Sequence, residues 1–241
     1  MTRNDDMTGI RNYTDFLAAL QAAGFSMAGG QAAGIYAVIP FSWNETPAWD
    51  TPVRWHTGHQ DTDPWAWRMR VLAENRDIAY GKFFFRKGGY ITRDWYPCFL
   101  AARRNGMDFA SAYQAGLFSQ TSRQIYRLIS DQGRVPLHAI RPMTGLKGPV
   151  IEKALVDLQM GLFITICGEM QHVTPYGSTQ GWPSTVLCTT EAFWGDDVFT
   201  EASSMTRQQA VRQITEQVLA LNPGAAAARI ERFIHASVSP I

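Results

Sequence analysis

The feature that most constrains the fold is a succession of three helix signals and a hairpin signal within residues 119–175. Apolar spacing predicts a first helix that is capped by Ser119, Thr121 or Ser122 and ends at Gly133. A short second helix follows from Pro136 to residue 140. A third helix begins at residues 148–149 and ends at residue 161, which is expected to adopt a left-handed conformation.

Residues 162–166 and 170–175 are expected to form two strands joined at Gly168-Glu169. Helix, short helix, helix and hairpin is the order of a winged helix-turn-helix unit, whose third helix enters the major groove of DNA. The alternatives are a small packed α+β subdomain, and a winged helix used for packing or dimerisation. The fold class predicted is therefore α+β, with a winged-helix unit in the second half.

The first half predicts a small sheet-plus-helices part. A helix is expected at 13–23 and strands at 34–43 and around residues 65–67, where tryptophan alternates with other residues. Residues 78–91 predict an aromatic-rich hairpin that turns at Lys87-Gly88-Gly89. The expected division is residues 1–110 as this N-terminal region, 115–200 as the winged-helix unit and 201–241 as a C-terminal helical extension.

The charge distribution favours a nucleic-acid partner for the middle of the chain. The formal net charge is +1, but residues 68–160 hold 15 Lys/Arg against 7 Asp/Glu, and the rest holds 7 against 14. A basic middle with acidic flanks is the pattern expected of a face that contacts phosphates, and a solvated surface is the alternative. Double-stranded DNA is the partner predicted. The expected DNA contacts are Arg123, Arg134, Arg141, Lys147, Lys153, Lys82, Arg86 and Lys87.

The aromatic residues permit a second kind of site. Clustered Trp and Tyr side chains often line pockets for flat ligands, so a small aromatic ligand is a further possible partner. The expected pocket residues are Trp65, Trp67, Tyr80, Trp95 and Trp182. The alternative, for the hairpin aromatics above all, is that they form core. Neither a G-x-G-x-x-G motif nor a P-loop occurs, so no cofactor is predicted.

His56 and His59 lie near Asp61 and Asp63 in a loop rich in Gly and Pro, and this pattern leaves metal binding open. Zinc sites take their ligands from rigid elements, so no metal is predicted. The three cysteines form no CxxC pair and are expected to be reduced. The first residues show no signal peptide and no run of about 18 apolar residues occurs, which favours a cytoplasmic protein without a membrane partner.

Four stretches within residues 63–200 carry a family resemblance: DPWAWR, IAYGKFFFRKGGYITRDWYPCF, LVDLQMGLFITI and GWPSTVLCTTEAFWG. Together they resemble a bacterial branch of shorter proteins related to the AlkZ-like winged-helix DNA glycosylases. The resemblance implies winged-helix architecture and association with DNA.

The parent glycosylases excise alkylated bases or unhook crosslinks with a Gln-x-Gln motif that positions water. This chain has no Gln-x-Gln; the pair Gln208-Gln209 has the wrong spacing, so the catalytic residue is unknown. The function expected is that of a DNA-binding protein recognising modified or damaged DNA. The alternatives are a glycosylase with a different catalytic residue, and a small-molecule-binding protein or enzyme with an aromatic pocket.

Overall fold

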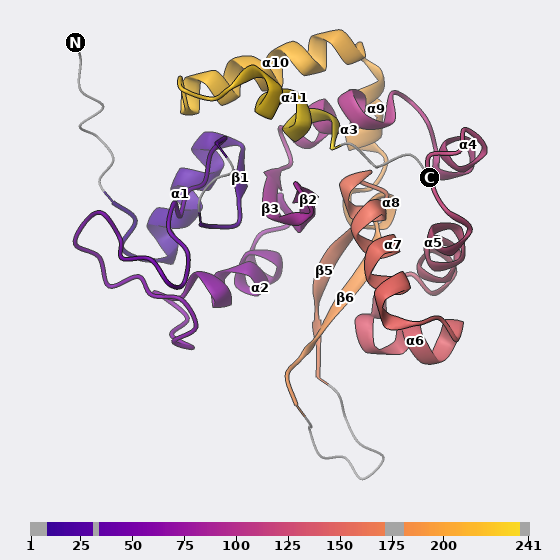
Figure 1. Ribbon diagram of the computed structural model, residues 1–241, viewed down its shortest axis with the longest axis horizontal. Helices are drawn as coiled ribbons and strands as arrows, with labels where there is room; N and C mark the ends of the chain where they lie inside the picture. Colours follow the sequence, from indigo (N-terminus) through magenta and orange to yellow (C-terminus); the bar gives the residue numbers. More distant parts are fainter. Residues whose placement is uncertain (1–8, 31–33, 172–180, 237–241) are drawn as a thin grey trace.

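The computed structural model describes residues 9–30, 34–171 and 181–236 (Figure 1). The helices are α1 (Tyr13–Ala23), α2 (Pro64–Glu74), α3 (Tyr96–Arg104), α4 (Phe109–Gln114), α5 (Gln120–Gln132), α6 (Leu137–Thr144), α7 (Gly148–Met160), α8 (Thr190–Trp194), α9 (Asp197–Ser203), α10 (Arg207–Leu221) and α11 (Ala227–His235). The strands are β1 (Phe25–Met27), β2 (Ile78–Phe84), β3 (Lys87–Thr92), β4 (Val135–Pro136), β5 (Ile164–Met170) and β6 (Ser184–Thr189). None of these helices is long and apolar enough to cross a membrane.

One six-stranded antiparallel sheet runs through the molecule in the order β1-β3-β2-β5-β6-β4. Its two halves come from different parts of the chain, and they join where Tyr80 of β2 pairs with Ile166 of β5. The aromatic-rich hairpin and the strands that follow α7 therefore share a sheet. This mixed α and β architecture agrees with the predicted class.

Helices cover both faces of the sheet. Successive residues of β2 alternate between two cores, as strand geometry requires: Ile78 and Tyr80 face one core and Ala79 faces the other. The first core is closed by α1, α2, α5, α6 and α7, and the second by α3, α10 and α11. Figure 1 shows α10 and α11 together at one end of the molecule and α6 at the opposite end.

The strand predicted around Trp65 is wrong, because these residues belong to α2. The Asp63 side chain accepts from the backbone N–H of Trp65 as the N-cap, and Pro64 occupies the first turn, where its missing N–H costs nothing. The start signal therefore outweighs the alternating composition. Residues 34–43 likewise form no regular strand where they are described; Ala37 makes one isolated bridge to Met27.

The aromatic-rich hairpin turns two residues earlier than predicted. Phe85 and Arg86 occupy the turn with φ of 50° and 64°, and both expected turn glycines lie inside β3. A Cβ on Gly89 would meet the Phe84 ring at 2.4 Å, so this glycine is needed for close packing rather than for the turn.

The end of the third predicted helix also differs in detail. Gly161 has a φ of −75°, and the left-handed residue is Leu162 with a φ of 61°. A Cβ at Gly161 would lie 2.8 Å from the Phe118 ring, which explains the glycine. The short helix α6 continues past its predicted end and includes Pro142.

The predicted turn at Gly168-Glu169 is wrong, because both residues belong to β5, which continues to Met170. Its partner is β6, with a register shift between Ile166 and Gly168. Residues 172–175 of the strand predicted next lie outside the described residues. The hairpin partner is therefore the strand at 184–189.

Candidate nucleic-acid interface

Residues 120–160 form three helices, α5, α6 and α7, which pack at the end of the sheet formed by β5, β6 and β4. After α5, the two-residue strand β4 pairs with β6, with Val135 opposite Leu187. The helices α6 and α7 follow, and then β5 pairs with β6 on its other edge. Ile125 and Ile129 of α5 and Leu155 and Leu158 of α7 are buried in a common core, so this core fixes where α6 and the start of α7 lie.

The segment from residue 133 to 151 contains Arg134, Arg141 and Lys147 but neither Asp nor Glu. Arg141 on α6 and Lys147 at the N-cap of α7 are exposed, and neither side chain makes an ion pair or hydrogen bond within the described residues. Exposed apolar side chains accompany them. We define the α6–α7 surface as Leu137, Arg141, Met143, Lys147 and Val150.

The N-terminus of α7 opens onto this surface. Residues 148–150 are exposed, and the Lys147 side chain makes no capping hydrogen bond. The first N–H groups of a helix lack intrahelical partners and carry the positive end of the helix dipole. An anion approaching the α6–α7 surface therefore meets two side-chain cations and a helix N-terminus.

The two acidic residues of α7 are neutralised by cations of the structure. Asp157 is buried and accepts from Lys153 at 2.7 Å and from Arg86 at 3.0 Å. Glu152 lies 3.4 Å from Lys82. Three of the expected DNA-contacting cations are thus engaged in ion pairs on α7, two of them from the β2–β3 hairpin.

The second half of α7 is covered by that hairpin. The buried Gln159 accepts from the backbone N–H of Lys82 at 2.9 Å, where β2 departs from regular pairing. Every residue from Ala154 to Met160 is buried. Only the first turns of α7 are therefore open to a partner.

The other expected DNA contacts lie in different surroundings. The Arg123 guanidinium lies 4.8 Å from the Tyr113 ring centroid. Arg134 is exposed, and its guanidinium donates to the carbonyl of Cys167 at 3.1 Å. Lys87 is exposed at the start of β3.

Three of the five expected pocket residues are packing residues. Trp67 is 0% exposed and stacks on Phe16 with ring centroids 5.0 Å apart. Tyr80 packs on Tyr90, and the half-buried Trp95 packs on Phe25. Trp67 and Tyr80 are buried in the core, and Trp95 lines a separate hollow beside α10, so the three share no common ligand site.

The structure does bring Trp65 and Trp182 together. Both line a hollow of about 420 Å³, with His56, Arg68, Met69, Glu169, Pro183 and Thr185. The Arg68 guanidinium lies 3.3 Å from the Trp65 ring centroid, and the His56 ring lies 4.7 Å from the same side chain. Arg68 was missed by sequence reasoning; its i, i+3 spacing from Trp65 would have indicated the pair had the segment been assigned to a helix.

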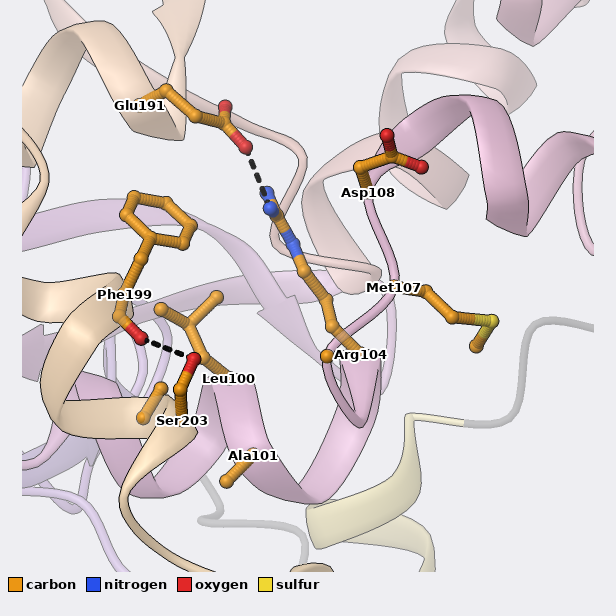
Figure 2. Close-up of a pocket in the computed structure, with 10 residues that line it drawn as sticks. Leu100, Ala101, Arg104, Met107, Asp108, Glu191, Phe199 and Ser203 are labelled. Atoms are coloured by element: carbon orange, nitrogen blue, oxygen red, sulfur yellow. Dashed lines mark hydrogen bonds and ion pairs between the residues drawn. The ribbon is translucent and has the colours of Figure 1, made fainter.

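A second cavity, of about 180 Å³, surrounds Arg104 (Figure 2). The Arg104 side chain is 5% exposed; it donates to Glu191 Oε1 at 2.6 Å and also to the carbonyl of Leu162. Figure 2 shows it extending from α3 toward Glu191, with Asp108 and Phe199 on either side. Within the part of the chain that the structure describes, Arg104 Nε and Glu191 Oε2 are buried without a protein partner, and a cavity of this size beside such polar atoms can hold water.

The loop that contains His56 and His59 is held to the start of α2 by hydrogen bonds to Asp63. Asp63 is buried, and its carboxylate accepts from the backbone N–H groups of His56, Gly58 and Trp65. Within the described residues, no group of three or more His, Cys, Asp or Glu side chains is placed to hold a metal ion.

The two cysteines on β5 and β6 have pKa values shifted in opposite directions, downward for Cys167 and upward for Cys188. The Cys188 thiol donates a hydrogen bond that lowers the pKa of Cys167, and Arg134 acts in the same direction, whereas burial raises the pKa of Cys98. A lower pKa gives more thiolate at a given pH, so we expect limiting iodoacetamide at neutral pH to alkylate Cys167 first. Peptide mass spectrometry over time checks this order; earlier labelling of Cys98 or Cys188 would contradict it.

Comparison with known proteins places the chain in one family. The model of the family described as AlkZ related matches residues 10–235, which is nearly the whole chain. No curated protein and no solved structure matches. The match spans both halves of the sheet and the helices on its two faces, and the chain therefore belongs to the AlkZ-related family.

Proposed function

We propose that residues 115–200 form a winged-helix unit that binds double-stranded DNA through the α6–α7 surface. The observation that carries the proposal is this surface itself: in an acid-free segment, the Arg141 and Lys147 side chains are exposed and make no ion pair within the described residues, beside the open N-terminus of a 13-residue helix. Phosphates bind to helix N-termini and to Lys and Arg side chains.

The order of the elements supports the same proposal. Helices α5, α6 and α7 are followed by the paired strands β5 and β6, and β4 adds a third strand on the β6 side. In winged-helix proteins the third helix enters the major groove with its N-terminal residues near the bases. Here the hairpin covers the end of α7, so only its first turns would enter the groove.

The ion pairs on α7 remove an objection to DNA binding. Two carboxylates on a groove-facing helix would repel phosphates, but Asp157 is buried between two cations and Glu152 lies beside Lys82. The electrostatic attraction that α7 offers to an approaching phosphate therefore comes from Lys147 and the helix N-terminus.

The family relation supports modified or damaged DNA as the target. The chain belongs to the AlkZ-related family, and the resemblance to AlkZ-like glycosylases directs the proposal to duplexes that carry altered bases. Because the sequence lacks Gln-x-Gln, we propose recognition and assign no catalytic residue.

Replacing Arg141 and Lys147 together by alanine is expected to weaken duplex binding about tenfold at moderate salt and to reduce the salt slope by about 2, since each removes roughly one phosphate contact. Fluorescence anisotropy with a labelled duplex measures both. The melting temperature should stay nearly unchanged, because both side chains are exposed.

The matched control replaces Arg212 and Arg229 by alanine. These two arginines are exposed on α10 and α11, at the opposite end of the molecule in Figure 1, and have the same charge. Equal losses in the two double variants would show that binding depends on total charge and would contradict the α6–α7 surface as the interface.

A further inference from the structure

We propose that the hollow lined by Trp65 and Trp182 binds an unstacked nucleobase of the DNA. This inference rests on the proposed function and adds a base-stacking site to it. The hollow lies beside α2 and the β5–β6 hairpin, and its volume of about 420 Å³ falls within the range of about 300 to 1,000 Å³ typical of small-ligand sites.

The aromatic side chains in the hollow are unusually accessible. Trp182 is 88% exposed and Trp65 is 43% exposed, whereas Trp67, two residues further along α2, is fully buried. An exposed indole offers a flat apolar face to a partner. Stacking of a base on an aromatic side chain is worth about 1 to 3 kcal/mol and tolerates any base.

Arg68 is held in position to extend the stacking surface. Its Nε–H donates to the carbonyl of Trp65 at 2.9 Å, and its guanidinium lies on the Trp65 ring at 3.3 Å. Arg68 is half-buried, and its guanidinium also lies 5.8 Å from the Tyr80 ring centroid. Its terminal N–H groups donate to no described residue, which leaves them for a ligand. Proteins that bind unpaired bases use arginine planes in this way.

The charges in the hollow suit a neutral base better than a phosphate. The ionisable lining residues are Arg68, Glu169 and His56, so a cation and an anion share the site. A phosphate would be repelled by the Glu169 carboxylate. The exocyclic amino group of a base, in contrast, can donate to that carboxylate, and its ring carbonyl can accept from Arg68.

The hollow is placed so that DNA on the α6–α7 surface could reach it. Helix α6 packs on β6, and α2 packs on β5, the other strand of the same hairpin. Figure 1 shows α2 and α6 on opposite sides of the β5–β6 hairpin. A duplex that crosses the hairpin from α6 would bring a displaced base to Trp182 and Arg68.

The test compares a fully paired duplex with the same duplex carrying one bulged 2-aminopurine, a fluorescent base with an exocyclic amino group. We expect the wild-type protein to bind the bulged duplex more tightly and to quench its fluorescence. Trp182→Ala should weaken bulged-duplex binding about fivefold or more and abolish the quenching, while binding of the paired duplex changes less than twofold. Trp182→Phe should restore most of the preference.

Trp43→Ala is the matched control, because Trp43 is 73% exposed and lies outside the hollow. Equal wild-type affinity for the two duplexes, or equal effects of Trp182→Ala and Trp43→Ala, would overturn the stacking site and leave the proposed DNA binding intact. If neither duplex binds, the proposed function fails and the stacking site fails with it. Quenching of free 2-aminopurine riboside without duplex binding would identify a site for a free ligand and would also overturn the proposal.

Discussion

Replacing Arg104 by alanine is expected to lower the free energy of unfolding by about 3 kcal/mol, the lower end of the effect of breaking a buried ion pair. The guanidinium joins Glu191 of α8 and the carbonyl of Leu162, which precedes β5, to α3. It also lies 4.0 Å from the Phe163 ring centroid. The lower end applies because Glu191 is 42% exposed and can be solvated when its partner is removed.

Urea denaturation of the variant measures this loss of stability, and two further substitutions serve as comparisons. Arg93→Ala removes the arginine of a more exposed ion pair with Glu201 and should cost less than about 1 kcal/mol. Glu191→Gln keeps an acceptor for Arg104 and should cost less than Arg104→Ala. A loss for Arg104→Ala no greater than that for Arg93→Ala would contradict the account of Arg104 as a buried link between these elements.

Replacing Trp67 by alanine is expected to cost about 3 to 5 kcal/mol through lost packing and the cavity left behind. The ring is fully buried between α1 and the sheet, with Tyr13 and Phe16 as aromatic neighbours. Its Nε1 has no hydrogen-bond partner among the described residues, so Trp67→Phe loses only volume and should cost clearly less.

The neighbouring Trp65 is the control for this substitution, since it lies on the same helix and is 43% exposed. Trp65→Ala should cost about 1 kcal/mol or less by urea denaturation, because most of its contacts are with exposed or half-buried side chains. If Trp67→Ala and Trp65→Ala cost the same, the orientation of α2 in the structure is wrong.

Elements with strong boundary residues were predictable from the sequence. Gly24 ends α1 with a φ of 83°, Ser119 caps α5, and Thr206 with Gln209 forms a capping box at the start of α10. The three helices before β5 were also predicted, because each has a Gly or Pro boundary and the first and third have an apolar face at helical spacing.

Long-range pairing could not be predicted in the same way. Residues 170–175 were expected to pair with 162–166 because they follow closely, whereas β5 pairs with β6 after a longer connection and also with β2. The alternating tryptophans near Trp65 favour a strand by composition, but the Asp63 cap and Pro64 start a helix there. Local composition does not show which strands become neighbours.

The candidate site was predictable in part for the same reason. Arg141 and Lys147 are exposed, as the sequence predicts for cations that lie next to glycine and proline turns. The pairing of Lys82 and Arg86 with acids of α7 depends on packing of the hairpin against that helix, whereas the pair between Lys153 and Asp157 is an i, i+4 pair within α7. The meeting of Trp65 with Trp182, and of Arg104 with Glu191, likewise depends on the tertiary fold.

The most direct test of the central claim is the affinity of the purified protein for a fluorescent duplex across a salt series. If the α6–α7 surface and its neighbouring cations contact phosphates, log affinity should fall linearly with log salt, with a slope of about −3 or steeper. Tighter binding of a duplex with an abasic site would support recognition of modified DNA. Absence of binding at about 50 mM salt, or an affinity that does not change with salt, would contradict the proposed DNA-binding function.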